Sequence, residues 1–131
     1  SKAKEQGLTP LCKIVAHSTH SQKPSEFTVA PVGAISSVLE KAGWAVNDVD
    51  LWEINEAFAM VTMLAINELK LDESKVNVNG GACALGHPIG ASGARILVTL
   101  IHALKNRGLK KGIASLCIGG GEAVAMAVEA Y

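Results

Sequence analysis

The alternation of strand-like and helix-like segments is the feature that most restricts how this chain folds. Strand-like runs occupy residues 11–18, 51–54, 76–79, 112–118 and 122–129, and helical patterns at 31–42, at 55–69 and up to Gly108 separate the first four runs. This alternation predicts a mixed, mostly parallel sheet with helices on both faces. Gly119-Gly120-Gly121 between the last two runs predicts a hairpin, so we expect an α/β fold with a five-stranded mixed β-sheet whose last strand is antiparallel.

The composition excludes several classes of protein. The chain has 131 residues, 49% of them hydrophobic, and 12 basic residues balance 12 acidic ones, so we expect one soluble domain and no nucleic-acid partner. Apolar runs are too short to span a membrane. The three cysteines lack the CxxC spacing of zinc sites, and His17 and His20 are predicted on opposite faces of one strand, so we expect no metal. Sparse cysteine indicates a reducing, cytoplasmic compartment.

Two segments point beyond a self-contained domain. Residues 2–6 followed by Gly7 are typical of the last turn of a helix, so we expect residues 1–10 to be the tail of a preceding helix and residues 11–131 to be the domain. Residues 55–69 are apolar nearly all round, which predicts a helix covered on most sides. Such coverage requires a second layer, from a dimer partner or from a part of the protein that is absent here.

Three chemically useful residues lie at predicted strand ends. Asn55 follows the run 51–54, His87 lies in the glycine-rich loop after 76–79, and Cys117 is close to the end of 112–118. Ligands of such sheets bind beyond the carboxyl ends of the strands. We therefore expect these side chains to share one pocket.

A thiol, an imidazole, an amide and bare glycine N–H groups are the components of acyl-transfer sites. Each residue also has an ordinary structural explanation: Asn55 as a helix cap, His87 as a hydrogen-bonding loop residue and Cys117 as an apolar filler. The loop has the spacing of a phosphate-binding loop, but His87 stands where the lysine is required. A hydrolase that pairs His87 with Cys83 or Cys117 remains open.

Three motifs resemble, in order and spacing, the signatures of one enzyme family. They are Asn55-Glu56-Ala57-Phe58-Ala59, the stretch from Gly80-Gly81 through Gly86-His87-Pro88-Ile89-Gly90 to Ser92-Gly93 and Arg95, and Cys117-Ile118-Gly119-Gly120-Gly121. Together they are similar to the C-terminal half of thiolases, in particular the biosynthetic acetoacetyl-CoA type. The resemblance implies two similar halves, each with a five-stranded mixed sheet, stacked around two central helices, and we assign the helix at 55–69 to that central layer.

The resemblance also implies catalytic roles. His87 would activate a nucleophilic cysteine of the missing N-terminal half and contribute to the oxyanion hole for the thioester, and Asn55 would hold the water that completes this hole. Cys117 would be the general acid and base of the condensation. The N–H of Gly119 would help form a second oxyanion hole.

The remaining implications concern substrates and assembly. Phe58 would line the pantetheine tunnel, and Phe27 stands where many members have residues that shape the acyl pocket. Coenzyme A thioesters would be substrates, with no separate cofactor, in the reversible conversion of two acetyl-CoA to acetoacetyl-CoA. We expect a dimer or tetramer of the whole protein and, because the nucleophile is not at Cys12 or Cys83, no activity from this chain alone. The alternative is a noncatalytic module that binds CoA thioesters or serves assembly.

Overall fold

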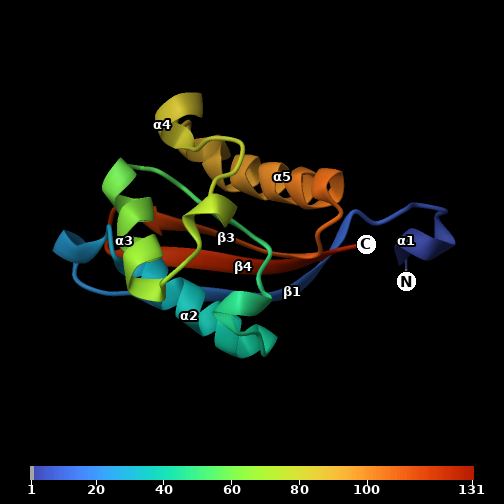
Figure 1. Cartoon of the computed structure of the whole chain (residues 1–131), viewed down its shortest axis with the longest axis horizontal. Coiled ribbons are helices and arrows are strands. Elements are labelled where there is room, and N and C mark those ends of the chain that lie inside the picture. Colours follow the sequence, from blue (N-terminus) through green and yellow to red (C-terminus); the bar gives the residue numbers. More distant parts are fainter. Residues whose placement is uncertain (1) are drawn as a thin grey trace.

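A four-stranded β-sheet with helices on both faces organises the computed structural model, which describes residues 2–131 (Figure 1). The strands lie in the order β1 (Cys12–Ser21), β4 (Glu122–Ala130), β3 (Lys111–Ile118) and β2 (Leu51–Ile54). Strand β4 is antiparallel to both of its neighbours, and β2 is parallel to β3. The mixed sheet with an antiparallel last strand is therefore confirmed, and β1, β2 and β3 end at the same edge.

The prediction of a fifth strand at 76–79 is wrong. Val76 makes one isolated bridge to Trp52 after a short 3₁₀ helix, Glu73–Lys75. Asn77 then adopts a left-handed conformation with φ of 48°, which ends any strand. Its side-chain amide makes two hydrogen bonds of 2.9 Å, accepting from the N–H of Ile54 and donating to the carbonyl of Ile54. The Asn77 side chain thus satisfies the backbone N–H and carbonyl of Ile54, which a further strand would otherwise have paired.

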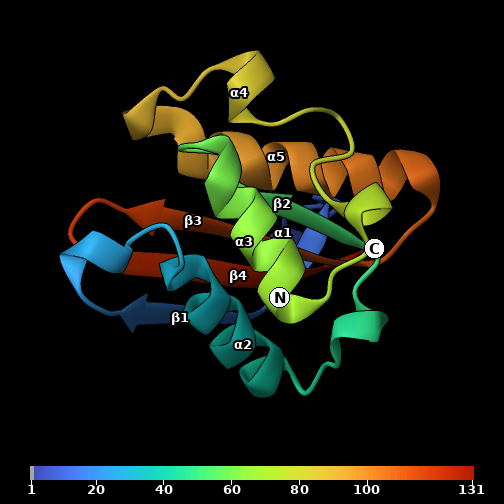
Figure 2. The ribbon, with the colours of Figure 1, turned by 60° about the vertical axis from the view of Figure 1, so that its left-hand side comes forward.

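The helices divide between the two faces of the sheet. Helices α2 (Ala30–Ala42) and α3 (Ala59–Leu69) cover one face, and α5 (Ile89–Arg107) lies on the other (Figure 2). The short helix α4 (Ala82–Leu85) precedes α5 and projects from the body of the molecule (Figure 1). None of the helices formed by residues 2–131 is long and apolar enough to cross a membrane.

The start of the chain contains the expected helical turn. It is α1 (Lys2–Glu5), and Gly7 follows with φ of 66°, as the glycine signal predicts. Ser1, the first residue of the proposed tail at 1–10, lies outside the described residues.

Small residues let the helices approach the sheet closely. Ala123, Ala125 and Ala127 of β4 are buried on the α2 face, which confirms the expected layer against the alanine side. On the other face, a Cβ at Gly112 would lie within 3.0 Å of the side chains of Leu100 and Leu104 in α5. Both helices therefore pack where the strands carry little side-chain volume.

Helix α3 begins later than predicted and is partly buried within the described chain. It begins at Ala59 rather than Asn55, because Phe58 is extended, with φ of −143° and ψ of 151°. Only Val61, Thr62 and Ala65 are buried, whereas the side chains of Met60 and Met63 are 50% and 65% exposed. Within residues 2–131, α3 is therefore covered only where it packs on the sheet beside α2, and its coverage by a second layer from another part of the protein stays a prediction.

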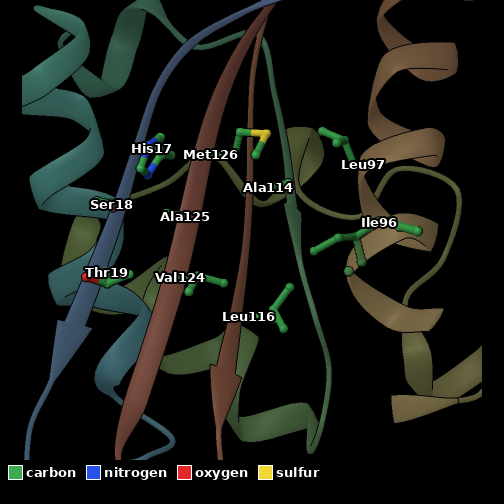
Figure 3. Close-up of a pocket in the computed structure, with 12 residues that line it drawn as sticks. His17, Ser18, Thr19, Ile96, Leu97, Ala114, Leu116, Val124, Ala125 and Met126 are labelled. Atoms are coloured by element: carbon green, nitrogen blue, oxygen red, sulfur yellow. The ribbon is translucent and has the colours of Figure 1, made fainter. Parts of the chain in front are cut away.

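An apolar groove lies beside α5, the long helix that packs on its face of the sheet. The groove has a volume of about 420 Å³ and lies between α5 and the sheet (Figure 3). Its apolar side chains include Ile96 and Leu97 of α5 and Leu116, Val124 and Met126 of the strands. This part of the sheet is left uncovered by the helices.

Replacement of Asn77 tests how the end of β2 is closed. Asn77→Ala is expected to lower the free energy of unfolding by about 2–4 kcal/mol, because two backbone groups of Ile54 lose their partners and alanine disfavours a positive φ. Asn77→Gly is expected to lose about 1 kcal/mol less, because glycine tolerates that φ. Urea unfolding measures both values. Equal losses in the two variants would contradict the contribution of backbone strain.

Candidate functional site

Asn55 and His87 meet at the carboxyl edge of the sheet. The N–H of Asn55 donates to the carbonyl of Ser115 at 2.9 Å, so its backbone continues the pairing of β2 with β3. Its side chain is fully buried, and Nδ2 lies 3.5 Å from Nε2 of His87. Because α3 begins four residues later, Asn55 is not the cap of that helix. Its amide is directed at the histidine, as the convergence of strand ends predicts.

Ser92 determines which nitrogen of His87 carries the proton. Nδ1 of His87 lies 2.6 Å from the Ser92 hydroxyl, and that hydroxyl donates its hydrogen to the carbonyl of Pro88 at 3.1 Å. With the hydroxyl hydrogen on Pro88, and with the donor Nδ2 of Asn55 facing Nε2, we assign Nδ1–H as the donor to Ser92. The lone pair of Nε2 then faces the N–H of Asn55. Sequence reasoning missed this role of Ser92, although it lies in the quoted motif.

Cys117 reaches the same edge from the other face of the sheet. It belongs to the core that packs against α2 and α3, and Ile54 pairs with Ser115, two residues before it. Burial raises the pKa of the Cys117 thiol, which therefore stays protonated near neutrality. Within residues 2–131 no hydrogen bond joins this thiol to Asn55 or His87. The structure brings Cys117 to the shared edge without placing it in direct contact with the other two.

Gly119 lies in the tight turn of the terminal hairpin. The turn is closed by the Gly121 N–H, which donates to the carbonyl of Ile118 at 3.1 Å, so the Gly119 N–H takes no part in closing it. Gly119 is exposed at the edge where β3 ends. Gly121 is required by the backbone, because its φ is 99° and a Cβ would overlap the carbonyl oxygen of Gln22.

Phe27 and Phe58, the two predicted substrate-binding residues, contact each other. Their ring centroids are 6.2 Å apart with an interplanar angle of 64°, an edge-to-face arrangement. Phe58 follows Asn55 by three positions and is 58% exposed. The pair forms an apolar surface near the end of β2.

A buried ion pair that sequence reasoning missed links β2 to α5. Glu53 is 2% exposed, and Oε2 accepts a hydrogen bond of 3.1 Å from Nη1 of Arg95. Burial raises the pKa of Glu53 to about 7, although Arg95 acts in the opposite direction. The second oxygen, Oε1, has no partner among the described residues. The sequence did contain a signal for this pair: Glu53 is a charged residue within a short apolar strand, and buried charges are rarely left without a partner.

Glu56 is a second carboxylate that the sequence did not single out. Its Oε1 accepts from Nδ2 of Asn77 at 3.1 Å, and its Oε2 accepts from the N–H of Cys83 at 3.0 Å. Desolvation and the Glu56 carboxylate raise the pKa of the Cys83 thiol. The nitrogens of His87 are directed at Ser92 and Asn55. These contacts disfavour the hydrolase in which His87 activates Cys83.

Metal ligands are not grouped at this edge. Within residues 2–131, no group of three or more histidine, cysteine, aspartate or glutamate side chains is arranged to hold a metal ion. The chemistry that this chain presents is that of an amide, an imidazole, a buried thiol and a glycine turn.

Comparison with known proteins assigns this arrangement to a family. The family model described as thiolase, C-terminal domain, matches residues 8–130. The chain belongs to the thiolase family. It is 57% identical over 129 residues to an acetyl-CoA acetyltransferase of Thiocystis violacea and 53% identical to the cytosolic acetyl-CoA acetyltransferase of Mus musculus. Each alignment covers 98% of the chain and about a third of the relative, 33% and 32% respectively.

Solved thiolase structures have the same fold. The acetyl-CoA acetyltransferase of Bacillus anthracis superposes with a TM-score of 0.97 at 55% identity, and human mitochondrial 3-ketoacyl-CoA thiolase superposes equally well at 46% identity. Both comparisons cover 99% of this chain and 33% of the other. The chain therefore corresponds to a thiolase C-terminal domain that spans about a third of the proteins it matches.

Replacement of Ser92 tests the tautomer of His87. In this thiolase domain we expect ¹⁵N shifts of the His87 ring to report the Nδ1–H form, and Ser92→Ala to give a mixture with the Nε2–H form, because the acceptor at Nδ1 is lost. Ser36→Ala is the matched control, since its hydroxyl also donates to a backbone carbonyl one helical turn earlier, that of Val32. An unchanged Nδ1–H form in Ser92→Ala would contradict the assignment.

Glu53 makes stability depend on pH. The folded domain binds the Glu53 proton more tightly than the unfolded chain, because the pKa is raised from 4.5 to about 7. Stability is therefore expected to fall as the pH rises through this interval, by about 3 kcal/mol at most. Glu53→Gln resembles the protonated form and should flatten the profile, with a stability close to wild type near pH 4.5 and higher at pH 8. Parallel urea-unfolding profiles for the two proteins would contradict this expectation.

Proposed function

We propose that this domain supplies half of the catalytic groups of an acetyl-CoA acetyltransferase, which reversibly converts two acetyl-CoA to acetoacetyl-CoA and free CoA. The observation that carries the proposal is the contact between Asn55 and the Nε2 side of His87. Two polar side chains, one fully buried and one in a loop, converge there beyond the strand ends. The high identity to proteins named acetyl-CoA acetyltransferase supports this choice of reaction.

The proposed role of His87 follows from its tautomer. With Nδ1–H held by Ser92, the lone pair of Nε2 is the basic site of the ring, and it can exchange its long 3.5 Å contact with the Asn55 amide for the proton of a nucleophilic cysteine supplied by the other part of the protein. Once protonated, Nε2–H becomes a donor to the thioester oxygen as negative charge develops there. The buried Oδ1 of Asn55 has no partner within residues 2–131 and would accept from the water that completes the hole.

Cys117 and Gly119 are proposed to serve the second half of the reaction. The raised pKa of the Cys117 thiol suits proton donation to the carbanion of acetyl-CoA in the degradative direction. In the synthetic direction the CoA thiolate released on acetylation of the nucleophilic cysteine would take the Cys117 thiol proton and leave as free CoA. The Cys117 thiolate would then remove a methyl proton from the second acetyl-CoA. The exposed N–H of Gly119 would stabilise the oxyanion that forms on the acetylated cysteine.

The missing partner is proposed to be the N-terminal thiolase half, stacked on the α5 face. A central layer of two helices needs space for a second helix beside the first, and the apolar groove next to α5 offers that space. The α3 face already carries two helices, α2 and α3, so we place α5 rather than α3 in the proposed central layer. The length of the relatives, about three times that of this chain, supports a partner of this size. A dimer or tetramer of the whole protein remains our proposal.

The substrates are proposed to be short acyl-CoA thioesters. The Phe27 and Phe58 pair lies close to the end of β2, where it would contact the pantetheine arm and restrict the acyl pocket. No separate cofactor is required for this chemistry. The name of the mouse relative supports a cytoplasmic location.

A chimera tests the proposed function. The last third of the Thiocystis violacea relative is replaced by this chain, and thiolysis of acetoacetyl-CoA is assayed for the chimera and for the 131 residues alone. We expect activity from the chimera and none from the isolated chain, because the nucleophile is supplied by the other part. In the chimera, His87→Ala and Cys117→Ala are each expected to lower kcat by about a thousandfold.

The chain offers matched controls for these two variants. His102 is an exposed histidine of α5 and Cys12 is a partly buried cysteine of β1, so His102→Ala and Cys12→Ala should leave turnover near that of the chimera. Near-normal turnover in His87→Ala or Cys117→Ala would contradict the assigned roles. An inactive chimera that still binds CoA thioesters would favour the noncatalytic module.

A further inference from the structure

The carboxylate of Glu56 is directed into the loop that carries His87 rather than into solvent. It accepts hydrogen bonds from the side chain of Asn77 at 3.1 Å and from the N–H of Cys83 at 3.0 Å. Asn77 is itself bonded to both backbone groups of Ile54, at the end of β2. One carboxylate therefore connects the end of this strand with the first turn of α4, four residues before His87.

The position of the Glu56 carboxylate explains why residue 81 is a glycine. Its φ of −109° and ψ of −166° are extended and open to any residue, so the backbone does not require glycine. A Cβ at Gly81, however, would overlap the carboxyl group of Glu56. The absence of a side chain at Gly81 and the position of Glu56 are thus two parts of one contact.

Ser92 holds the imidazole of His87 at the end of this loop, but few other interactions fix the backbone between Gly81 and Gly86 relative to the strand. Ala82 is buried, but the residues from Cys83 to Pro88 are exposed, and the side chain of Leu85 is 57% exposed. Apolar burial therefore contributes little to the position of this loop. The contact of His87 with Asn55 is long, at 3.5 Å, so a small displacement of the loop breaks it.

We propose that Glu56 is a positioning residue: its carboxylate, packed against Gly81, holds the loop 80–88 so that His87 faces Asn55. Asn55 and Glu56 are neighbours in sequence, so one strand end supplies both the partner of the histidine and the group that fixes the histidine's loop. The consequence for catalysis rests on the proposed function, whereas the consequence for the geometry of His87 does not.

The first test is a double-mutant cycle on the 131-residue chain. Glu56→Ala and Gly81→Ala are each expected to abolish the NOE between the His87 ring and the Asn55 side-chain amide and to accelerate hydrogen exchange of the Cys83 amide about tenfold or more. The double variant is expected to match Glu56→Ala alone, because the new Cβ then has no carboxylate to displace. Full additivity, or a retained NOE in Glu56→Ala, would overturn the proposal.

Two further variants separate positioning from a loss of folding. Glu56 and the exposed Glu73 both line a second groove, between α3 and residues 76–83, so Glu73→Ala is the matched control and should leave both signals unchanged. Glu56→Gln keeps an acceptor for the Cys83 N–H but turns an amide donor toward Asn77. It should retain the fold, measured by urea unfolding, and show exchange between that of wild type and Glu56→Ala. If the Cys83 amide of Glu56→Gln exchanged as slowly as in wild type, the hydrogen bond from Asn77 to residue 56 would not be needed to hold the loop, which would contradict this part of the proposal.

Turnover in the chimera distinguishes this proposal from the proposed function. Glu56→Ala is expected to lower kcat about tenfold or more and to change KM by less than about twofold, because the substrate-binding surface is not altered. A lost NOE with an unchanged kcat supports the positioning role and counts against the catalytic role of His87. A retained NOE with a reduced kcat overturns the positioning role.

Discussion

The two hydrogen bonds between the Asn77 side chain and the backbone of Ile54 are the interaction on which the site depends. They satisfy the exposed edge of β2 at its last residue, where a fifth strand would otherwise be needed. The chain then runs extended through Phe58, and α3 begins at Ala59. Because of this extended stretch, Asn55 is directed at His87 instead of capping a helix, and Glu56 extends into the loop that follows Asn77.

The buried pair of Glu53 and Arg95 fixes α5 relative to the same strand. A buried ion pair is weak evidence for stability, because desolvation of both charges offsets their attraction. The raised pKa of Glu53 and its unpaired Oε1 indicate that this pair is not optimised for stability. Its effect is geometric, since Arg95 lies one turn after Ser92, which holds the imidazole of His87. Strand β2 thereby determines the position of the histidine through its helix as well as through its loop.

The alternation of side chains along strands explains why Cys117 approaches from a different direction. In β2, Leu51 packs in the core on the α5 side of the sheet, whereas Trp52 and Ile54 pack in the core on the α2 side. Because side chains alternate between the two faces, Asn55 lies on the same face as Leu51, the α5 side. In β3, Cys117 follows Ile113 by four positions and therefore lies on the same face, in the core on the α2 side. An amide and a thiol on opposite faces of a sheet can act on one ligand only beyond the strand ends. The proposed substrate therefore lies across the edge of the sheet rather than on either face.

The sequence by itself determined the order of strands and helices, the antiparallel last strand, the glycine caps and the edge at which Asn55, His87 and Cys117 gather. These properties follow from local periodicity and strand direction, which neighbouring residues set. Only the tertiary structure decided the number of strands, the half-exposed α3 and the contacts of Glu53, Glu56 and Ser92. The left-handed Asn77 replaces a strand with a side chain, and Glu53 meets Arg95 across 42 positions of sequence. Contacts of this kind depend on which surfaces the folded chain brings together, and no local pattern encodes that.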